Sequence, residues 1–329
     1  MQLGCVEAVM SEPEVSVVMA VFNGASALGA TMDSVLAERT VKLELIVVDD
    51  GSTDETSAIL RGYAERDSRV RVLTEQNRGL TSALINGCAQ AYGEFIARQD
   101  CGDITLRGRF RHQVDFVRSN PDVVMTSCGT RFVGPEGEFL YDTRQTGAEL
   151  HDGLTQLDPN RVRGVSSHPS VMFRRSSYKA VGGYRSEFRV AQDLDLWMRF
   201  AEVGQCLATS EVLCEVRLAL GSISGSQRLA QVEATKTIVA CAAARRRGGD
   251  DGPVLEAWRT RQAGARSRIW RLRTLSHAQF CYFVASVLRH NNPARARYYY
   301  FKALRYWVLF PRAYLGLSRL ALRSRRLGA

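Results

Sequence analysis

The sequence predicts an α/β protein with a mostly parallel central sheet flanked by helices and a basic helical C-terminal extension. Two observations support this class. Between residues 15 and 100, short apolar runs rich in β-branched residues alternate with segments of helical periodicity. Such alternation is typical of parallel strands joined by helices that cover both faces of a sheet. The composition then changes, because residues 226–329 hold 21 Lys and Arg against 4 Asp and Glu.

The first half supplies four expected strands and three expected helices. The continuous apolar run "VSVVMAV" (15–21) is typical of a strand buried on both faces. Further strands are expected at 43–48, 69–73 and 94–100. Helices are expected at 25–39, 54–66 and 80–92, the first with Asn23 as its N-cap.

The second half is less regular. We expect a hairpin at 131–142, a strand at 168–175, a helix at 191–204 and a last strand at 211–218. The resulting organisation is an N-terminal tail (1–13), one α/β domain (14–225) and the basic helical region (226–329), which a "RRRGGDDGP" break at 245–253 interrupts.

The charge is distributed unevenly. The chain carries 44 basic and 34 acidic residues, of which 23 basic and 30 acidic residues fall in 1–225. The basic region therefore points to an anionic partner, either a membrane surface or nucleic acid, and nucleic acid is the less favoured because no recognition motif accompanies the charge. A helical cap that packs on the α/β domain is the alternative interpretation of this region.

Cysteine spacing and hydropathy bear on location. The eight cysteines are irregularly spaced and form no C-x-x-C pair, which predicts reduced thiols rather than disulfides or a zinc site. The sequence contains no window of eighteen uninterrupted apolar residues, so we expect no transmembrane helix. The acidic start "MQLGCVEAVMSEPE" does not resemble a secretory signal. We therefore expect a cytoplasmic protein, with a peripheral position on the inner face of the membrane if the basic region binds lipid.

Carboxylates follow two of the expected strands. Asp49 and Asp50 follow the strand at 43–48, while Asp100 ends the strand at 94–100 and Asp103 follows it. The carboxyl ends of parallel strands meet at one edge of a sheet, where ligands bind. Clustered carboxylates need a cation or hydrogen-bond donors nearby. A nucleoside diphosphate with a divalent metal ion would supply both.

Five segments, in order over residues 14–225, resemble family 2 glycosyltransferases. They are "VSVVMAVFNGASAL", "ELIVVDDGSTDET", "NRGLTSALINGCAQAYGEFIARQDCGD", "SHPSVMFRRSSYKAVGGYR" and "AQDLDLWMRF". The resemblance implies the GT-A fold, whose sheet is Rossmann-like. No G-x-G-x-x-G follows the first strand, so a dinucleotide-binding enzyme is disfavoured.

The resemblance assigns roles around the donor nucleotide. It implies that Ala20 and Phe22 line the base pocket and that Asp50 accepts a hydrogen bond from the base, while Asp49 supports the turn. Guanidinium groups suit phosphate oxygens, and the residues expected to face the donor or its phosphates are Arg78, Arg98 and Asp100.

The resemblance also implies an inverting mechanism. Asp193, in the first turn of the helix at 191–204, would act as general base, and a helix N-terminus favours its ionised form. A divalent metal ion, Mg²⁺ or Mn²⁺, held by Asp100 and Asp103 would stabilise the leaving diphosphate. Two positions depart from the family pattern: Gly102 stands where a second metal-binding Asp is usual, which weakens the metal expectation, and Gln192 stands where Glu is usual.

Several neighbouring residues have two interpretations. His168, Gly182, Gly183 and Gln192 could face the acceptor or a phosphate. Equally, His168 could make a structural hydrogen bond, and the glycines could serve a turn. Asp195 lies four residues before Arg199, so an ion pair within the helix is favoured over catalysis.

The implied function is transfer of one sugar from a nucleotide-diphosphate sugar, UDP-linked by preference, to a hydroxyl of a saccharide or lipid-linked saccharide during surface polysaccharide synthesis. The Q-x-x-R-W motif of processive members is absent from the sequence, which favours single transfer over polymerisation. The alternative is a catalytically degenerate, nucleotide-binding and membrane-associated relative, because Gly102 removes a usual metal ligand.

Overall fold

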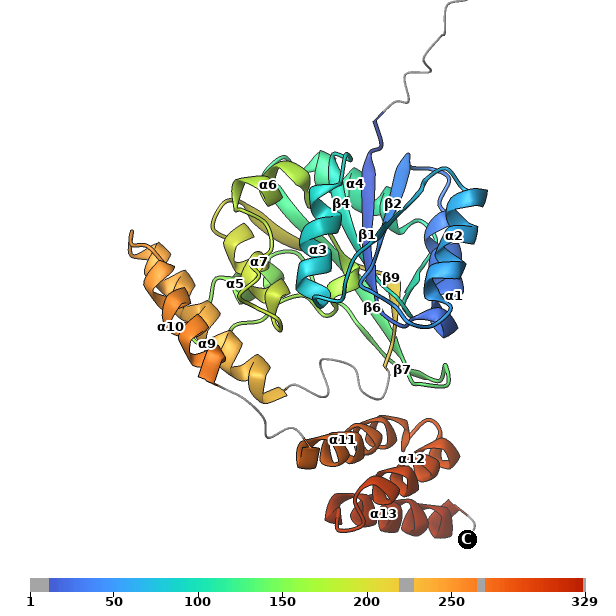
Figure 1. Ribbon diagram of the computed structural model, residues 1–329. Coiled ribbons are helices and arrows are strands. Elements are labelled where there is room, and N and C mark those ends of the chain that lie inside the picture. The colour runs from blue at the N-terminus through green and yellow to red at the C-terminus, as the bar shows by residue number, and fades with distance from the viewer. Residues whose placement is uncertain (1–11, 219–227, 265–269, 328–329) are drawn as a thin grey trace, which may run out of the picture.

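One nine-stranded sheet organises the protein. The computed structural model describes residues 12–218, 228–264 and 270–327, and expectations for the segments 1–11 and 219–227 lie outside this part. The strand order is β3-β2-β1-β4-β8-β6-β9-β5, with β7 paired to β6 (Figure 1). The strands span β1 Val15–Val21, β2 Leu43–Asp49, β3 Val70–Thr74, β4 Phe95–Asp100, β5 Ile104–Thr105, β6 Val123–Val133, β7 Phe139–Thr143, β8 Val171–Arg174 and β9 Gln205–Arg217.

The predicted parallel order holds for the first four strands. β1 pairs in parallel with β2 and β4, and β2 pairs in parallel with β3. The sheet is mixed beyond β4, because β8 runs antiparallel to both of its neighbours, β4 and β6. Since β4 and β6 both oppose β8, they run in the same direction, and β9 is parallel to β6. The carboxyl ends of β1, β2, β4, β6 and β9 therefore share one edge.

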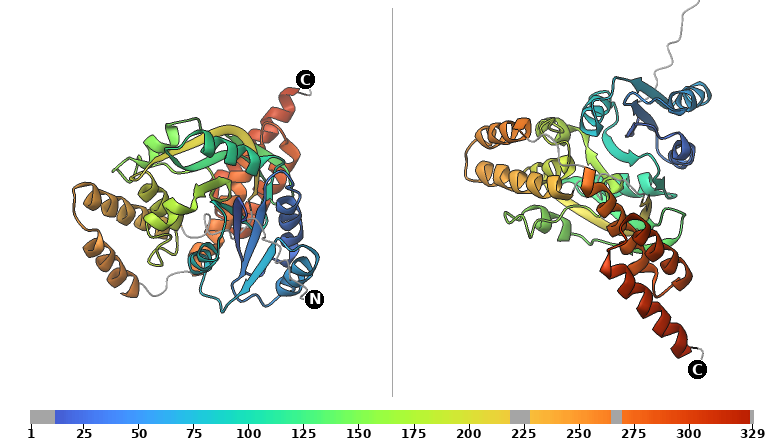
Figure 2. Two further views of the ribbon diagram at one scale, coloured as in Figure 1. Left: turned by 90° about the horizontal axis from the view of Figure 1, so that it is seen from above. Right: turned by 60° about the horizontal axis from the view of Figure 1, so that its bottom comes forward.

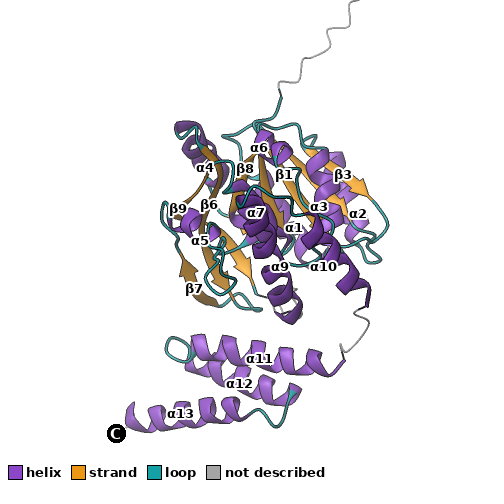
Figure 3. Ribbon diagram, turned by 90° about the vertical axis from the view of Figure 1, so that its left-hand side faces the viewer, coloured by secondary structure: helices purple, strands orange, loops and turns teal. Residues whose placement is uncertain are grey.

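Helices cover both faces of the sheet (Figure 3). On one face α3 (Leu80–Ala89) packs through Leu84 against Val18 and Ile46. On the other, three helices share a second cluster with Val17 and Met19: α1 Ala25–Leu36, α2 Thr56–Arg66 and α4 Arg109–Ser119. The sequence analysis did not anticipate α4. The N-cap expectation for α1 is wrong, because Gly24 takes that position and Asn23 adopts φ 52°.

The second half packs around an aromatic cluster. Its helical elements are α5 Glu149–Leu154, a 3₁₀ turn His168–Ser170, α6 Arg175–Ala180 and α7 Gln192–Phe200. Trp197 of α7 is almost fully buried and stacks on Phe200 with ring centroids 5.8 Å apart, while Phe173 of β8 lies 5.8 Å away. This packing fixes α7 against the sheet.

The basic region forms two helical layers. α9 (Arg228–Arg246) and α10 (Gly252–Gly264) join the same core as α7 through Ile238 and Trp258. The second layer is α11 Trp270–Leu288, α12 Pro293–Tyr306 and α13 Pro311–Leu327 (Figure 2). Its core includes Phe132 of β6 and Leu140 of β7, so it docks on the β6–β7 hairpin. Among the described helices, none combines the length and apolarity needed to cross a membrane.

Candidate functional site

The acidic turn after β2 is held by two separate sets of hydrogen bonds. Asp49 is buried and accepts from the backbone N–H of Ser52 at 2.9 Å and from the Ser57 hydroxyl. Asp50 accepts from the N–H groups of Arg78 at 2.7 Å and Gly79 at 2.9 Å. The two adjacent charges are thus each compensated by their own donors, and Asp50 fastens the loop after β3 to the site.

Gly51 permits this close approach. It has φ 77°, and a Cβ at this position would lie 2.8 Å from the backbone nitrogen of Asn77. Glycine avoids both the strain and the clash. The loop that carries Arg78 can therefore lie directly on the acidic turn, with the Arg78 side chain exposed.

The turn after β1 is tied to the same acidic turn. The Asn23 side chain accepts from the N–H of Thr53 at 2.8 Å, and the N–H of Gly24 donates to the Thr56 hydroxyl at 2.9 Å. Phe22 remains 51% exposed beside these contacts. The strand register places Ala20 opposite both Val48 and Asp100, so the ends of β1, β2 and β4 converge as the sequence predicted.

The carboxyl groups of Asp100, at the end of β4, and Asp103, just after it, have pKa values shifted in opposite directions. Burial opposes ionisation of Asp100, but the ion pair with Arg98 outweighs it and lowers the pKa of Asp100. Burial, reinforced by the charge of Asp100, raises the pKa of Asp103 to about 8. Asp103 accepts from the N–H of Arg217 at 3.0 Å, which links this turn to the end of β9.

Arg98 corrects a prediction. The sequence analysis placed its guanidinium at the edge, facing phosphates, but the side chain is fully buried within β4. It donates to the carbonyls of Val18 at 2.7 Å and Gln99 at 2.6 Å, to Asp100, and to Nε2 of His168 at 3.2 Å. The Arg98 guanidinium is therefore occupied by contacts within the protein and does not present free donors to a ligand.

His168 lies in the 3₁₀ turn before β8, not within a strand as expected. Its Nε2 accepts from Arg98 and lies 2.8 Å from the hydroxyl oxygen of Tyr184. Burial, followed by the charge of Arg98, lowers the pKa of His168 to about 4, although Asp193 and Asp100 act in the opposite direction. The imidazole is therefore neutral at physiological pH, with its proton on Nδ1 because Nε2 accepts from Arg98.

Tyr184, which the sequence analysis did not single out, reaches His168 because of a glycine turn. Gly182 and Gly183 have φ 79° and 70°, and a Cβ on Gly183 would lie 2.8 Å from the Tyr178 ring. The turn therefore requires glycine for conformation and space, which agrees with the structural interpretation of this pair.

Asp193 lies in the first turn of α7 and is partly exposed. Its Oδ1 accepts from the N–H of Leu194 at 2.9 Å, and the preceding buried Gln192 begins the helix. Ala191, at the N-cap, has φ 55°, a left-handed conformation that costs about 1 kcal/mol for a non-glycine residue. The start of α7 lies close enough to His168 for the Asp193 charge to act on its imidazole.

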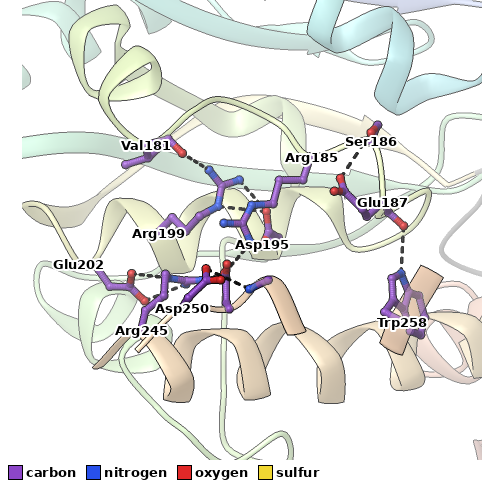
Figure 4. Close-up of polar contacts among 12 residues, drawn as sticks. Val181, Arg185, Ser186, Glu187, Asp195, Arg199, Glu202, Arg245, Asp250 and Trp258 are labelled. Carbon is purple, nitrogen blue, oxygen red and sulfur yellow. Dashed lines mark hydrogen bonds and ion pairs between the residues drawn. The ribbon is translucent and has the colours of Figure 1, made fainter. Parts of the chain in front are cut away.

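Asp195 is not an alternative to Asp193. It is buried and paired with Arg199, which also donates to the carbonyl of Val181 at 2.6 Å (Figure 4). The expected pair within the helix is confirmed. Arg185 bridges Asp195 to Asp251 at the start of α10, so charged contacts tie α7 to the first helical layer.

The described residues include no group of three or more His, Cys, Asp or Glu side chains placed to hold a metal ion. Asp100 and Asp103 supply two neighbouring carboxylates, and burial followed by the Asp100 charge raises the pKa of Asp103. Mg²⁺ in proteins is often held by one or two carboxylates together with substrate phosphates. The pair therefore fits a metal ion that arrives with a diphosphate.

Comparison with known proteins identifies the family. Residues 16–182 match the model of glycosyl transferase family 2, which covers just over half of the chain. The chain belongs to glycosyl transferase family 2. The matched residues contain the turns after β1, β2 and β4 at the carboxyl edge. The match ends before α7, the helix that carries Asp193.

Related glycosyltransferases match over about 200 residues. The "Putative glycosyltransferase EpsE" of Bacillus subtilis is 31% identical over 199 residues, 59% of this chain and 69% of EpsE. The "O-antigen biosynthesis glycosyltransferase WbnJ" of Escherichia coli is 28% identical over 186 residues, 56% of this chain and 70% of WbnJ. An uncharacterized Rickettsia prowazekii glycosyltransferase is 29% identical over 213 residues, 63% of this chain and 64% of its own length.

Solved glycosyltransferase structures share the fold. TarS residues 1–349 from S. aureus superpose with a TM-score of 0.54 at 15% identity, covering 89% of each chain. The mannosyltransferase PcManGT from Pyrobaculum calidifontis, in complex with GDP-Man and Mn²⁺, has a TM-score of 0.53 at 19% identity, covering 92% of this chain and 89% of PcManGT. The predicted GT-A fold is confirmed.

In this glycosyltransferase the predicted residues form two neighbouring groups. Asp50, Arg78 and Phe22 surround the turns after β1, β2 and β3. The second group gathers where β4, the 3₁₀ turn and α7 meet, and contains Arg98, Asp100, Asp103, His168 and Asp193. Gly183 lies beneath this second group, while Gly182 is exposed. Tyr184 and the Arg217 N–H belong to the site through tertiary contacts, for which the sequence carries no local signal.

Proposed function

We propose that this glycosyltransferase transfers a single sugar, with inversion, from a nucleotide-diphosphate sugar to a hydroxyl of a saccharide or lipid-linked saccharide. The observation that carries the proposal is the meeting of Asp100, Asp103 and the partly exposed Asp193 at the carboxyl edge. A UDP-sugar is the preferred donor. TarS structures with UDP and UDP-GlcNAc support this choice, whereas PcManGT was solved with GDP-Man.

The donor nucleotide is proposed to occupy the turns after β1, β2 and β3. The exposed Phe22 ring offers an apolar surface for the base beside Ala20. Asp50 keeps lone pairs beyond those used by the N–H groups of Arg78 and Gly79, and one can accept from the base. The exposed Arg78 guanidinium suits a phosphate oxygen.

Asp193 is proposed as the general base. Its carboxylate would take the proton of the acceptor hydroxyl as that oxygen attacks the anomeric carbon, and the bond to the diphosphate would break on the opposite face. Asp193 lies in the first turn of α7, where the helix dipole is positive. Neutral His168 can donate from Nδ1 to a substrate oxygen but cannot supply positive charge.

A divalent metal ion, Mg²⁺ or Mn²⁺, would be held by Asp100 and Asp103. When bound it would stabilise the negative charge on the leaving diphosphate. Gly102 has φ 100° and supplies no ligand, so most of the coordination would come from the donor and water.

The proposed setting is surface polysaccharide synthesis at the inner face of a membrane. The name of WbnJ supports a role in polysaccharide assembly. The basic region 226–329 is proposed to contact an anionic membrane surface, from which a lipid-linked acceptor would come. No nucleic-acid role is proposed.

The test compares Asp193→Asn with Asp152→Asn, the same change in the first turn of the surface helix α5. A thermal-shift panel of nucleotide sugars with Mn²⁺ identifies the donor first, because ligand binding stabilises the folded state. Asp193→Asn should then lose transfer by about 10²-fold or more while its donor-induced thermal shift is retained. Transfer at the wild-type rate in Asp193→Asn would overturn the assignment.

The alternative, a nucleotide-binding relative without catalysis, rests on Gly102. It predicts donor binding in the thermal-shift panel with no release of nucleoside diphosphate from any bound donor and acceptor. Release that depends on Asp193 decides for the enzyme.

A further inference from the structure

The corner between α12 and α13 exposes consecutive apolar side chains. We define the apolar corner as Trp307, Val308, Leu309, Tyr314 and Leu315, all of which are exposed. Val308 is 66% and Leu309 83% exposed, although both are aliphatic. Scattered exposed apolar residues are ordinary on protein surfaces, but three in succession at a loop are a candidate binding surface.

The helices behind the corner are closely packed. Tyr299, Tyr300 and Ala303 of α12 are buried, and Phe310 turns into the same core immediately after Leu309. Gly316 of α13 approaches so closely that a Cβ there would lie 2.3 Å from the Tyr300 ring. The layer therefore has a defined interior, and the apolar corner belongs to its outer surface.

The charged residues of the two helices that flank the corner have one sign. The sequence contains no Asp or Glu after Glu256. Lys302 and Arg305 precede the corner in α12, and Arg312 and Arg319 lie in α13. Surfaces that combine arginine and lysine with aromatic and aliphatic side chains bind anionic bilayers: the cations meet headgroups, the aromatic rings lie at the interface and the aliphatic groups enter the acyl boundary.

We propose that the apolar corner inserts into the headgroup–acyl boundary of an anionic lipid bilayer. A second copy of this chain is the weaker candidate, because it would bring an equally basic corner and the like charges would repel. Nucleic acid could neutralise the arginines and stack on Trp307, but it offers no apolar environment for Val308 and Leu309.

Contact of the apolar corner with a bilayer would also orient the candidate site relative to the membrane. The second helical layer docks on the β6–β7 hairpin through Phe132 and Leu140, and Arg295 of α12 pairs with Glu136 at the hairpin tip. β6 runs in the same direction as β4, so this tip projects from the edge that carries Asp100 (Figure 1). Resting on the proposed function, the inference places the bilayer on the substrate side of the sheet and makes the acceptor's lipid end its neighbour.

The experiment is flotation of the full-length protein with vesicles of phosphatidylglycerol and phosphatidylcholine, or of phosphatidylcholine alone. The test variant carries Trp307→Ser, Val308→Ser and Leu309→Ser. The matched control carries Tyr92→Ser and Val203→Ser, two exposed residues that precede β4 and β9 at the opposite edge of the sheet. Because all five side chains are exposed, circular dichroism should show both variants folded.

We expect the wild type and the control to float with anionic vesicles only. The triple variant should partition at least about tenfold more weakly, since it loses the apolar part of the contact. Equal flotation of wild type and triple variant, or no flotation of the wild type, overturns the proposal. If the triple variant loses a dimer that the wild type forms but still floats, the corner binds a second copy and the proposal is overturned. RNA binding by the wild type that vesicles do not compete would overturn it in favour of nucleic acid.

Flotation requires no sugar transfer, so the two proposals fail separately. A protein that binds donor and transfers sugar to a soluble acceptor but does not float retains the proposed sugar transfer and loses the apolar corner together with the proposed membrane contact of the basic region. A protein that floats but never releases nucleoside diphosphate retains the corner and loses the proposed function.

Discussion

The stability of the metal-free protein should fall as pH rises toward 8, because the folded state holds a proton on Asp103 that the unfolded state has released. Burial and the Asp100 charge raise the pKa of Asp103 to about 8, far above the ordinary value of 3.8. Between these values the folded state holds a proton that the unfolded state has released. The free energy of unfolding therefore decreases with increasing pH, by up to about 1.4 kcal/mol per pH unit.

The window from pH 6.5 to pH 8 isolates this effect. Below pH 6.5 His168 acts in the opposite sense, because its pKa is lowered to about 4 and only the unfolded state then takes up its proton. Above pH 6.5 that contribution changes by only about 0.4 kcal/mol, because half of the unfolded imidazoles have already lost their proton. Asp103 should thus remove about 2 kcal/mol of stability between pH 6.5 and pH 8.

The assay is urea denaturation of the chelator-treated protein at several pH values, for wild type and Asp103→Asn. The amide oxygen can still accept from the N–H of Arg217, so the contact at 3.0 Å is preserved while the titration is lost. We expect a slope in the wild type, a nearly flat profile in Asp103→Asn, and the wild-type slope in Asp152→Asn. Parallel profiles for wild type and Asp103→Asn would refute the assignment of the raised pKa to Asp103.

Two further predictions concern buried charge and the metal ion. Arg199→Met should lower the free energy of unfolding by about 3 to 5 kcal/mol because the buried Asp195 carboxylate then keeps only the longer, 3.7 Å contact with Arg185. Arg111→Met, which removes partly exposed pairs with Asp115 and Glu14, should cost under about 1 kcal/mol, and equal losses in urea denaturation would show that burial does not govern these pairs. Gly102→Asp should raise Mn²⁺ affinity in the presence of UDP several-fold, with a stability loss of about 1 to 2 kcal/mol from its φ of 100°; unchanged affinity by calorimetry would place the metal ion away from this turn.

The parts of the fold that local sequence determines were predicted well. β1 to β4 and their helices follow from alternating apolar periodicity, which is a property of neighbouring residues. The clustering of carboxylates also follows, because residues after parallel strands must share an edge. Asp193 was expected in the first turn of α7, because the helical pattern of the sequence places it there.

Helix bounds and caps were less accurate. Asn23 was expected to cap α1, but its side chain accepts instead from Thr53, thirty residues away in the next turn. α4 was not expected at all, since residues 101–130 carry no element predicted from the sequence. Capping side chains have several possible partners, and only the packed chain selects one.

The sequence by itself thus determined the family, the positions of the first four strands along the chain and the edge on which acidic residues gather. Only the tertiary structure determined which of the side chains at this edge are buried and paired, and therefore how their pKa values are shifted. The buried Arg98 donates to His168, which is 70 residues away in the chain, and Asp103 accepts from the N–H of Arg217, which is 114 residues away. Desolvation and pairing depend on which distant segments pack together, and those contacts set the pKa of each group; periodicity along the chain carries no information about them.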